Sequence, residues 1–160
     1  MKKCIRTSDH TNCHNVKGRH IGVLLYDGAM VKKALIVDDL PFDVELTRRV
    51  LQSCVSDHEV VVVGDGEEAL RELNKAHDFD IVLLDLKLPK IDGFEVLKEI
   101  SSKPFLSDLP IIVLSSSHHE ADRGRTRLLG AGEVVEKAID YSVFKENLTR
   151  ALTQYGFGFA

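Results

Sequence analysis

The chain has 160 residues, the size of a single domain, with 44% hydrophobic and 29% charged residues, which excludes a collagen-like or wholly disordered protein. No apolar run approaches the roughly 18 residues of a membrane-spanning helix, and the polar, basic segment Met1–Arg19 has no apolar core of a secretory signal. The chain has three cysteines, an odd number without the regular spacing of a disulfide scaffold, so we expect a reducing, cytoplasmic setting.

The formal net charge of −4 is unevenly distributed. Residues 1–32 carry six Lys/Arg and two Asp, whereas residues 33–160 carry 15 Lys/Arg and 23 Asp/Glu, a balance of −8. We therefore expect a flexible N-terminal extension over 1–32, one folded domain over 33–153 and a short tail over 154–160. The acidic domain is not expected to bind nucleic acid, because phosphate contacts need clustered positive charge.

Short apolar runs recur along the folded region, and most are rich in β-branched residues. Such runs are typical of strands buried on both faces of a parallel sheet. The five runs are Ala34–Val37, Val60–Val63, Ile81–Leu84, Ile111–Leu114 and Val134–Val135.

Segments with helical spacing of apolar residues lie between and after these runs. Pro41 suits the first turn of the first helix, and Asp140 can cap the last one. The fourth segment is the weakest helix, because Gly124 and several Arg dilute its apolar face. The predicted buried stripes are Phe42, Leu46 and Val50; Ala69, Leu70 and Leu73; Phe94, Leu97 and Ile100; Ala121, Leu128 and Leu129; and Phe144, Leu148 and Leu152.

Five strands that alternate with five helices predict a three-layer α/β domain with a doubly wound, five-stranded parallel sheet. The carboxyl ends of its strands then meet at one edge, where such sheets bind ligands.

Polar residues lie one or two positions beyond the end of four of the runs. Asp38 and Asp39 follow the first, Asp85 the third, Ser115 the fourth, and Lys137 comes two positions after the fifth. Three convergent carboxylates repel one another unless a cation compensates them, and an all-oxygen site suits Mg²⁺. A carboxylate beside Mg²⁺ and lysine can attack phosphorus. The residues therefore predict an aspartyl phosphate at Asp85.

The strings LIVDD, LLDLKLPKIDGFEVL and IIVLSSS, followed by Lys137, resemble in this order a response-regulator receiver domain of the chemotaxis type. The resemblance runs from about Lys33 to Leu152, and the intervals of 30 positions from Asp85 to Ser115 and 22 from Ser115 to Lys137 are typical of that family. It implies a flavodoxin-like fold and phosphoacceptor signalling. LSSS and IDYSVF resemble the stand-alone receivers that serve bacterial phytochrome-type kinases.

The resemblance implies a role for each matching residue. Asp85 is expected to be phosphorylated, and Asp38 and Asp39 to bind Mg²⁺ together with Asp85 and the backbone carbonyl of Lys87. Pro89 and Gly93 are expected to shape the loop after Asp85.

Two further residues are expected to hold the phosphoryl group. Ser115 is expected to hydrogen-bond the phosphoryl group and Lys137 to pair with it.

Two positions depart from the family pattern. The family normally has proline after the lysine, often with a cis bond, but Ala138 stands there, so we expect a trans peptide. Val134 replaces the usual aromatic switch residue, so the ordinary aromatic–hydroxyl coupling is not expected.

Three functions compete at this point. The leading hypothesis is a stand-alone phosphoacceptor, not an enzyme, that receives its phosphoryl group from a histidine kinase or phosphotransfer protein and signals to a downstream protein, without membrane contact. The second is a degenerate receiver that binds partners regardless of phosphorylation. A phosphohydrolase is disfavoured because Lys87 stands where a second acid is needed. Receivers of this type often pair through their fourth and fifth helices, which makes a homodimer one expected assembly.

Overall fold

The structure is a computed structural model that describes residues 31–55, 57–116 and 120–158. Most of the predicted extension over 1–32 lies outside these residues, and the boundaries at 32 and 153 stay predictions. Within the described ranges, no helix combines the length and apolarity that a membrane crossing needs.

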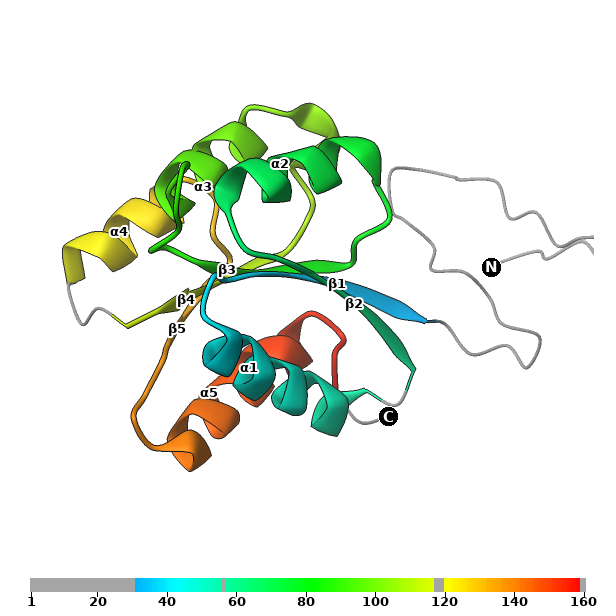
Figure 1. Cartoon of the computed structure of the whole chain (residues 1–160), viewed down its shortest axis with the longest axis vertical. Coiled ribbons are helices and arrows are strands. Elements are labelled where there is room, and N and C mark those ends of the chain that lie inside the picture. Colours follow the sequence, from blue (N-terminus) through cyan, green and yellow to red (C-terminus); the bar gives the residue numbers. More distant parts are fainter. Residues whose placement is uncertain (1–30, 56, 117–119, 159–160) are drawn as a thin grey trace, which may run out of the picture.

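Five parallel strands form one sheet in the order β2-β1-β3-β4-β5 (Figure 1). β1 and β3 lie side by side, with Val37 opposite Leu84, so the residues that follow them emerge together at the carboxyl edge. The predicted doubly wound sheet is therefore confirmed. The strands are β1 (Lys32–Val37), β2 (His58–Val63), β3 (Ile81–Asp85), β4 (Ile111–Ser115) and β5 (Glu133–Glu136).

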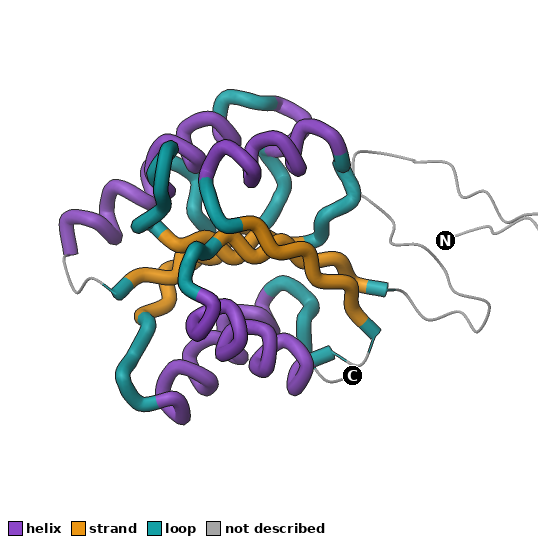
Figure 2. The backbone as a smooth tube through the Cα atoms, in the orientation of Figure 1, coloured by secondary structure: helices purple, strands orange, loops and turns teal. Residues whose placement is uncertain are grey.

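Helices cover both faces of the sheet, giving three layers (Figure 2). One layer contains α1 (Pro41–Cys54) and α5 (Tyr141–Gln154). The opposite layer contains α2 (Gly66–Lys75), α3 (Gly93–Ser101) and α4 (Glu120–Leu128), with a short 3₁₀ helix at Pro104–Leu106.

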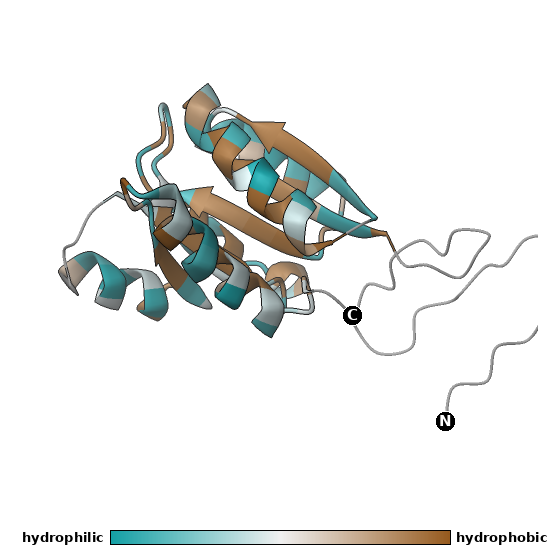
Figure 3. Ribbon diagram, turned by 90° about the horizontal axis from the view of Figure 1, so that it is seen from below, coloured by the Kyte–Doolittle hydropathy of each residue, from teal (hydrophilic) through white to brown (hydrophobic). Residues whose placement is uncertain are grey.

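The sheet separates two apolar cores, because alternate residues of a strand point to opposite faces. Leu35 and Val37 of β1 belong to the core beneath α2 and α3, whereas Ala34 and Ile36 belong to the core beneath α1 and α5. Phe157, in the predicted tail, is fully buried in the second core. Figure 3 shows the same arrangement as hydrophobic strands between helices of mixed hydropathy.

Most predicted helix stripes are buried, but two predictions are wrong. Phe42, in the first turn of α1, is 72% exposed and does not join the buried face of that helix. In α4, Ala121 and Leu128 are exposed, Leu129 is only partly buried, and Thr126 is the buried residue. The helix therefore faces the domain through a different side from the one its apolar residues predicted.

Three helices begin at an aspartate whose side chain accepts backbone N–H bonds, which satisfies donors at the helix start. Asp65 accepts from Glu68, Asp92 from Glu95, and Asp140 from Ser142 and Val143. The predicted cap at Asp140 is thus confirmed. α1 instead begins with Pro41 and has no side-chain cap, so the aspartates near its start are available for other contacts.

Candidate functional site

Three aspartates converge at the carboxyl edge of the two central strands. Asp38 and Asp39 follow β1, and Asp85 ends β3. One carboxylate oxygen from each can be chosen so that all three lie within 4.8 Å of one another. This follows from the topology, because adjacent parallel strands end at the same level of the sheet.

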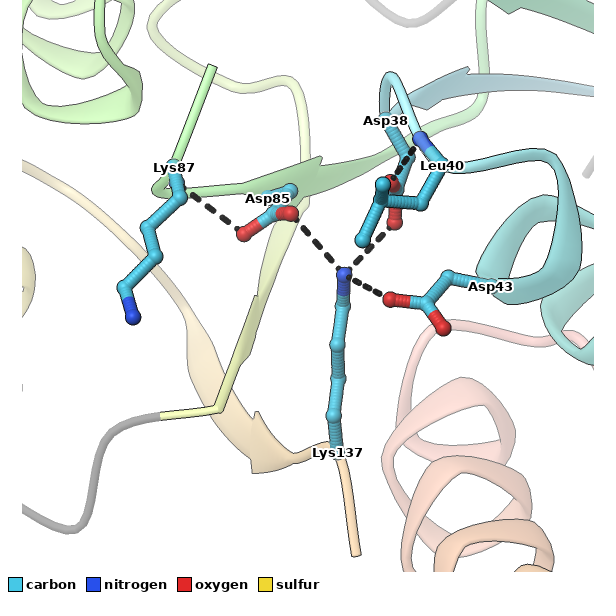
Figure 4. A network of polar contacts seen from close by, with 6 residues as sticks. All are labelled: Asp38, Leu40, Asp43, Asp85, Lys87 and Lys137. Carbon is cyan, nitrogen blue, oxygen red and sulfur yellow. Dashed lines mark hydrogen bonds and ion pairs between the residues drawn. The ribbon is translucent and has the colours of Figure 1, made fainter.

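The two inner carboxylates are buried and oriented by the backbone (Figure 4). Asp38 and Asp85 are 2% and 4% exposed, whereas Asp39 is exposed. The amide of Leu40 donates to Asp38 Oδ1 at 3.0 Å, and the amide of Lys87 donates to Asp85 Oδ1 at 3.0 Å. Each carboxylate therefore has one oxygen fixed by a neighbouring amide and directs Oδ2 into the site.

Lys137, in the loop after β5, places its ammonium among three carboxylates (Figure 4). Its Nζ lies 2.7 Å from Asp38 Oδ2, 2.9 Å from Asp85 Oδ2 and 2.9 Å from Asp43 Oδ2. An ammonium has three N–H donors, so these three contacts use all of them. The structure thus brings Lys137, which follows the edge strand β5, to Asp38 and Asp85 at the ends of β1 and β3.

Burial and pairing set the proton affinities of these groups. Burial acts to lower the pKa of Lys137, but hydrogen bonds to Asp38, Asp43 and Asp85 outweigh it and hold that pKa well above its ordinary value. Burial raises the pKa of the Asp38 carboxyl above its ordinary range, against the hydrogen bonds from Lys137 and Leu40 that lower it. Lys137 is therefore a permanent cation at neutral pH.

Ser115, predicted to hold the phosphoryl group, ends β4 and is buried. β4 lies between β3 and β5, so Ser115 stands at the same sheet edge as Asp85. It pairs in register with Glu136, and the amide of Lys137 donates to the Ser115 carbonyl at 2.9 Å. The loop that carries Lys137 is therefore anchored directly to this strand end.

The loop after Asp85 packs so tightly against the strand end that position 93 requires a glycine. A Cβ on Gly93 would lie 2.5 Å from the Asp85 carbonyl oxygen and 2.6 Å from Leu86 Cα, and the Gly93 amide donates to the Leu86 carbonyl at 3.0 Å. The Pro89 carbonyl accepts from the Ile91 amide at 2.9 Å. These contacts bring the start of α3 against the strand end that carries Asp85.

Comparisons with known proteins decide the family. Residues 34–149 match the model of the response regulator receiver domain. The chain belongs to the response regulator receiver family. It is 39% identical over 97 residues to the response regulator Rcp1 of Synechocystis, an alignment that covers 57% of this chain and 66% of Rcp1.

Two solved receivers have the same fold over most of this chain. The phosphorylated cyanobacterial phytochrome response regulator RcpA superposes with a TM-score of 0.72 at 35% identity, covering 78% of this chain and 93% of RcpA. The Mn²⁺-bound form of Rcp1 superposes with a TM-score of 0.70 at 31% identity, covering 81% of this chain and 96% of Rcp1.

The donor set of this receiver fits a divalent cation. Asp38, Asp39 and Asp85 offer oxygen atoms only, as Mg²⁺ and Mn²⁺ prefer, and they cluster closely enough for a single ion. The Lys137 ammonium contacts Oδ2 of both Asp38 and Asp85, which are the carboxylate oxygens without a backbone donor. A cation coordinated through these two oxygens would therefore compete with Lys137 for them.

Sequence reasoning missed Asp43, the third carboxylate on Lys137. It lies in the first turn of α1, four residues after Asp39. An acid in that turn is usually explained by the positive end of the helix. The spacing contained a usable signal, because side chains in the first turn of a helix lean towards its N-terminus, here the site itself.

Both departures from the family pattern are visible in the structure. No peptide bond among the described residues is cis, so the bond between Lys137 and Ala138 is trans, as predicted. Val134 is partly buried and packs against the core beneath α2 and α3. Neither departure keeps Lys137 from reaching Asp85.

Proposed function

We propose that this receiver accepts a phosphoryl group on Asp85 from the phosphohistidine of a kinase or phosphotransfer protein, in a reaction that depends on Mg²⁺. The observation that carries the proposal is the position of Asp85 Oδ2, buried beside the Lys137 ammonium and within an all-oxygen carboxylate cluster. A buried carboxylate held between cationic groups can act on phosphorus, because those groups offset the charge on the transferring oxygens.

In the transfer step, an electron pair of Asp85 Oδ2 forms the new O–P bond. The P–N bond of the phosphohistidine breaks, and its electron pair returns to the imidazole nitrogen, which takes up a proton. Lys137 and Ser115 would then pair with oxygens of the resulting acyl phosphate. A cation held by Asp38, Asp39, Asp85 and the Lys87 carbonyl would supply charge neutralisation of those oxygens. We assign Oδ2 of Asp85 as the attacking atom, because Oδ1 accepts from the Lys87 amide, whereas the Lys137 ammonium on Oδ2 can pass to an oxygen of the phosphoryl group.

The relatives support the finer parts of this proposal. RcpA is a phytochrome response regulator and was solved in phosphorylated form, and Rcp1 was solved with Mn²⁺. By extension we propose a sensor histidine kinase, of the phytochrome type in the simplest case, as the donor and a second protein as the target. A signal that passes to a second protein, and not to nucleic acid, agrees with the excess of acidic residues in this domain.

Intact mass spectrometry after incubation with acetyl phosphate and Mg²⁺ tests the proposal. We expect one base-labile phosphate adduct on the wild type and on Asp78→Asn, an exposed aspartate that pairs with Lys33. We expect none on Asp85→Asn, and none on the wild type when EDTA replaces Mg²⁺. An adduct that persists on Asp85→Asn would exclude Asp85 as the acceptor.

A second candidate is a receiver that binds its partner regardless of phosphorylation, and Val134 and Ala138 favour it. Beryllofluoride with Mg²⁺ mimics the phosphoryl group, and ¹H–¹⁵N spectra report which amides respond. Shifts confined to the strand ends of the site would support the second candidate, whereas shifts that extend through α4 and β5 would support phosphorylation-dependent switching.

A further inference from the structure

Asp43 occupies a position that the cation-binding cluster does not explain. It approaches Lys137 from α1, on the opposite side of the ammonium from Asp85 (Figure 4). Its carboxylate does not belong to the group of Asp38, Asp39 and Asp85 that can share an ion. Its side chain is 25% exposed, against 1% for Asp38 and 6% for Asp85. Asp43 is therefore the most hydrated of the three partners of Lys137.

The contacts of Lys137 divide into two kinds. Its bonds to Asp38 and Asp85 are made to two carboxylates of the cation cluster, at the oxygens that have no backbone donor. Its bond to Asp43 is made to a carboxylate outside that cluster. With a cation coordinated through those two oxygens, Lys137 would give up its partners on one side and keep Asp43 on the other.

We propose that Asp43 is a positioning residue, which retains the Lys137 ammonium at the edge of the site when a divalent cation displaces it from Asp38 and Asp85. This inference rests on the proposed function and deepens it. In the metal-free protein the ammonium serves as the counter-ion of the buried carboxylates, and Asp43 lets it move aside without losing all of its charged partners. Lys137 then stays within reach of a phosphoryl group that arrives on Asp85.

The surroundings of Asp43 leave room for this movement. Asp43, Lys137 and Ser116 line a hollow of about 420 Å³ between the start of α1 and the loop that leads into α5. Thr47, one turn after Asp43, lines the same hollow, and its buried hydroxyl has no hydrogen-bond partner among the described residues. A buried hydroxyl of this kind is costly unless something else satisfies it, and the displaced ammonium or a water beside it could do so.

Removal of Asp43 should therefore weaken cation binding. In the wild type, an ammonium that gives up Asp38 and Asp85 has only Asp43 as a charged partner, so this bond is stronger with the cation bound than without it. Asp43→Asn loses that gain, and the loss of one negative charge beside the cluster acts in the same direction. We expect Asp43→Asn to bind Mn²⁺ about tenfold more weakly than the wild type, which corresponds to about 1.4 kcal/mol of lost charge stabilisation in the cation-bound state. Glu45→Gln is the matched control, because Glu45 lies on the same helix, is exposed and pairs only with Arg49 in the described structure.

Titration with Mn²⁺ followed by electron paramagnetic resonance measures this affinity directly. Glu45→Gln should bind within twofold of the wild type, and thermal unfolding of both variants shows whether the fold is kept. An Asp43→Asn variant that also binds within twofold would overturn the inference. Acetyl phosphate labelling of the same samples separates two failures. If the wild type is labelled and the Mn²⁺ affinity of Asp43→Asn is unchanged, only the role of Asp43 is overturned. If the wild type is not labelled, the proposed function is overturned too.

The ammonium itself provides a second readout that a merely structural role would not move. In ¹⁵N spectra, a lysine ammonium is visible when hydrogen bonds slow its exchange with water. We expect the Lys137 signal of the wild type to shift on addition of Mg²⁺ and to remain visible. In Asp43→Asn it should be visible without Mg²⁺ and disappear with it. A signal that persists with Mg²⁺ in the variant would show that another group holds the ammonium.

Discussion

Helices α1 and α4 each follow a strand that ends at the site, but the domain holds them very differently. α1 buries Thr47, Val50, Leu51 and Cys54, and Asp43 in its first turn pairs with Lys137. Among residues 121–128 of α4, only Thr126 is buried. In Figure 3, α4 is the largely hydrophilic helix that follows the grey segment at the left.

This contrast in packing predicts where the receiver can change shape. Regions with few buried apolar contacts open at low free-energy cost, whereas densely packed elements open only with the whole domain. The α1 side of the site is fixed by packing and by ion pairs, so it can hold Asp38 and Lys137 in place. The α4 side rests on few contacts, so a change at Ser115, at the end of β4, can alter it at little cost.

The largest expected effect comes from the packed layer. Leu148 of α5 is fully buried in the core that it shares with α1, so Leu148→Ala should lower the free energy of unfolding by about 2–5 kcal/mol through lost apolar burial and a new cavity. Leu128→Ala removes the same atoms from α4, where Leu128 is 89% exposed, and should change stability by less than about 0.5 kcal/mol. Urea unfolding of both variants measures the contrast, and similar losses would refute it.

A smaller effect is expected from the charges of the site. Lys137→Met leaves Asp38 and Asp85 buried without their cationic partner, which should destabilise the protein by about 3 kcal/mol. Added Mg²⁺ should recover much of this loss, because an ion that binds only the folded state stabilises it. Thermal unfolding with and without Mg²⁺ tests both parts. Equal Mg²⁺ responses in the variant and in Leu148→Ala would show that the cation does not substitute for the lysine.

The fold and most of the site could be predicted from the sequence, because both depend on local patterns. The apolar runs predicted the strands. In a parallel sheet, the position of Asp38, Asp39 and Asp85 at strand ends then predicted that their carboxylates lie close together. Asp43 could not be found in this way, since its partner Lys137 lies 94 positions away and the contact depends on how α1 and the β5–α5 loop face each other. The exposure of Phe42 and Leu128 depends on the same long-range placement.

Acid pH offers a finer test of the site. The folded-state pKa of Asp38 is raised, mainly by burial, so the folded protein binds a proton more readily than the unfolded chain does. As pH falls from neutral towards the ordinary pKa of 3.8, this carboxyl therefore adds stability rather than removing it. Asp38→Asn should lose that gain, so its stability relative to the wild type should decline as the pH is lowered. Denaturant unfolding at pH 7 and near pH 4.5 measures the change, and a constant difference would contradict it.

The smallest effect concerns the attachment of α4. The Arg125 guanidinium lies 4.1 Å from the centre of the Phe94 ring of α3, a cation–π contact between two exposed or half-buried side chains worth about 0.5–1 kcal/mol. Arg125→Ala should increase hydrogen–deuterium exchange in α4 by a few-fold while exchange in α1 stays unchanged, because few other contacts hold α4 down. Arg127→Ala, an exposed arginine two residues away, is the control. Equal increases in α1 and α4 would mean that α4 opens only with the whole domain, and the contrast between the two helices would then be lost.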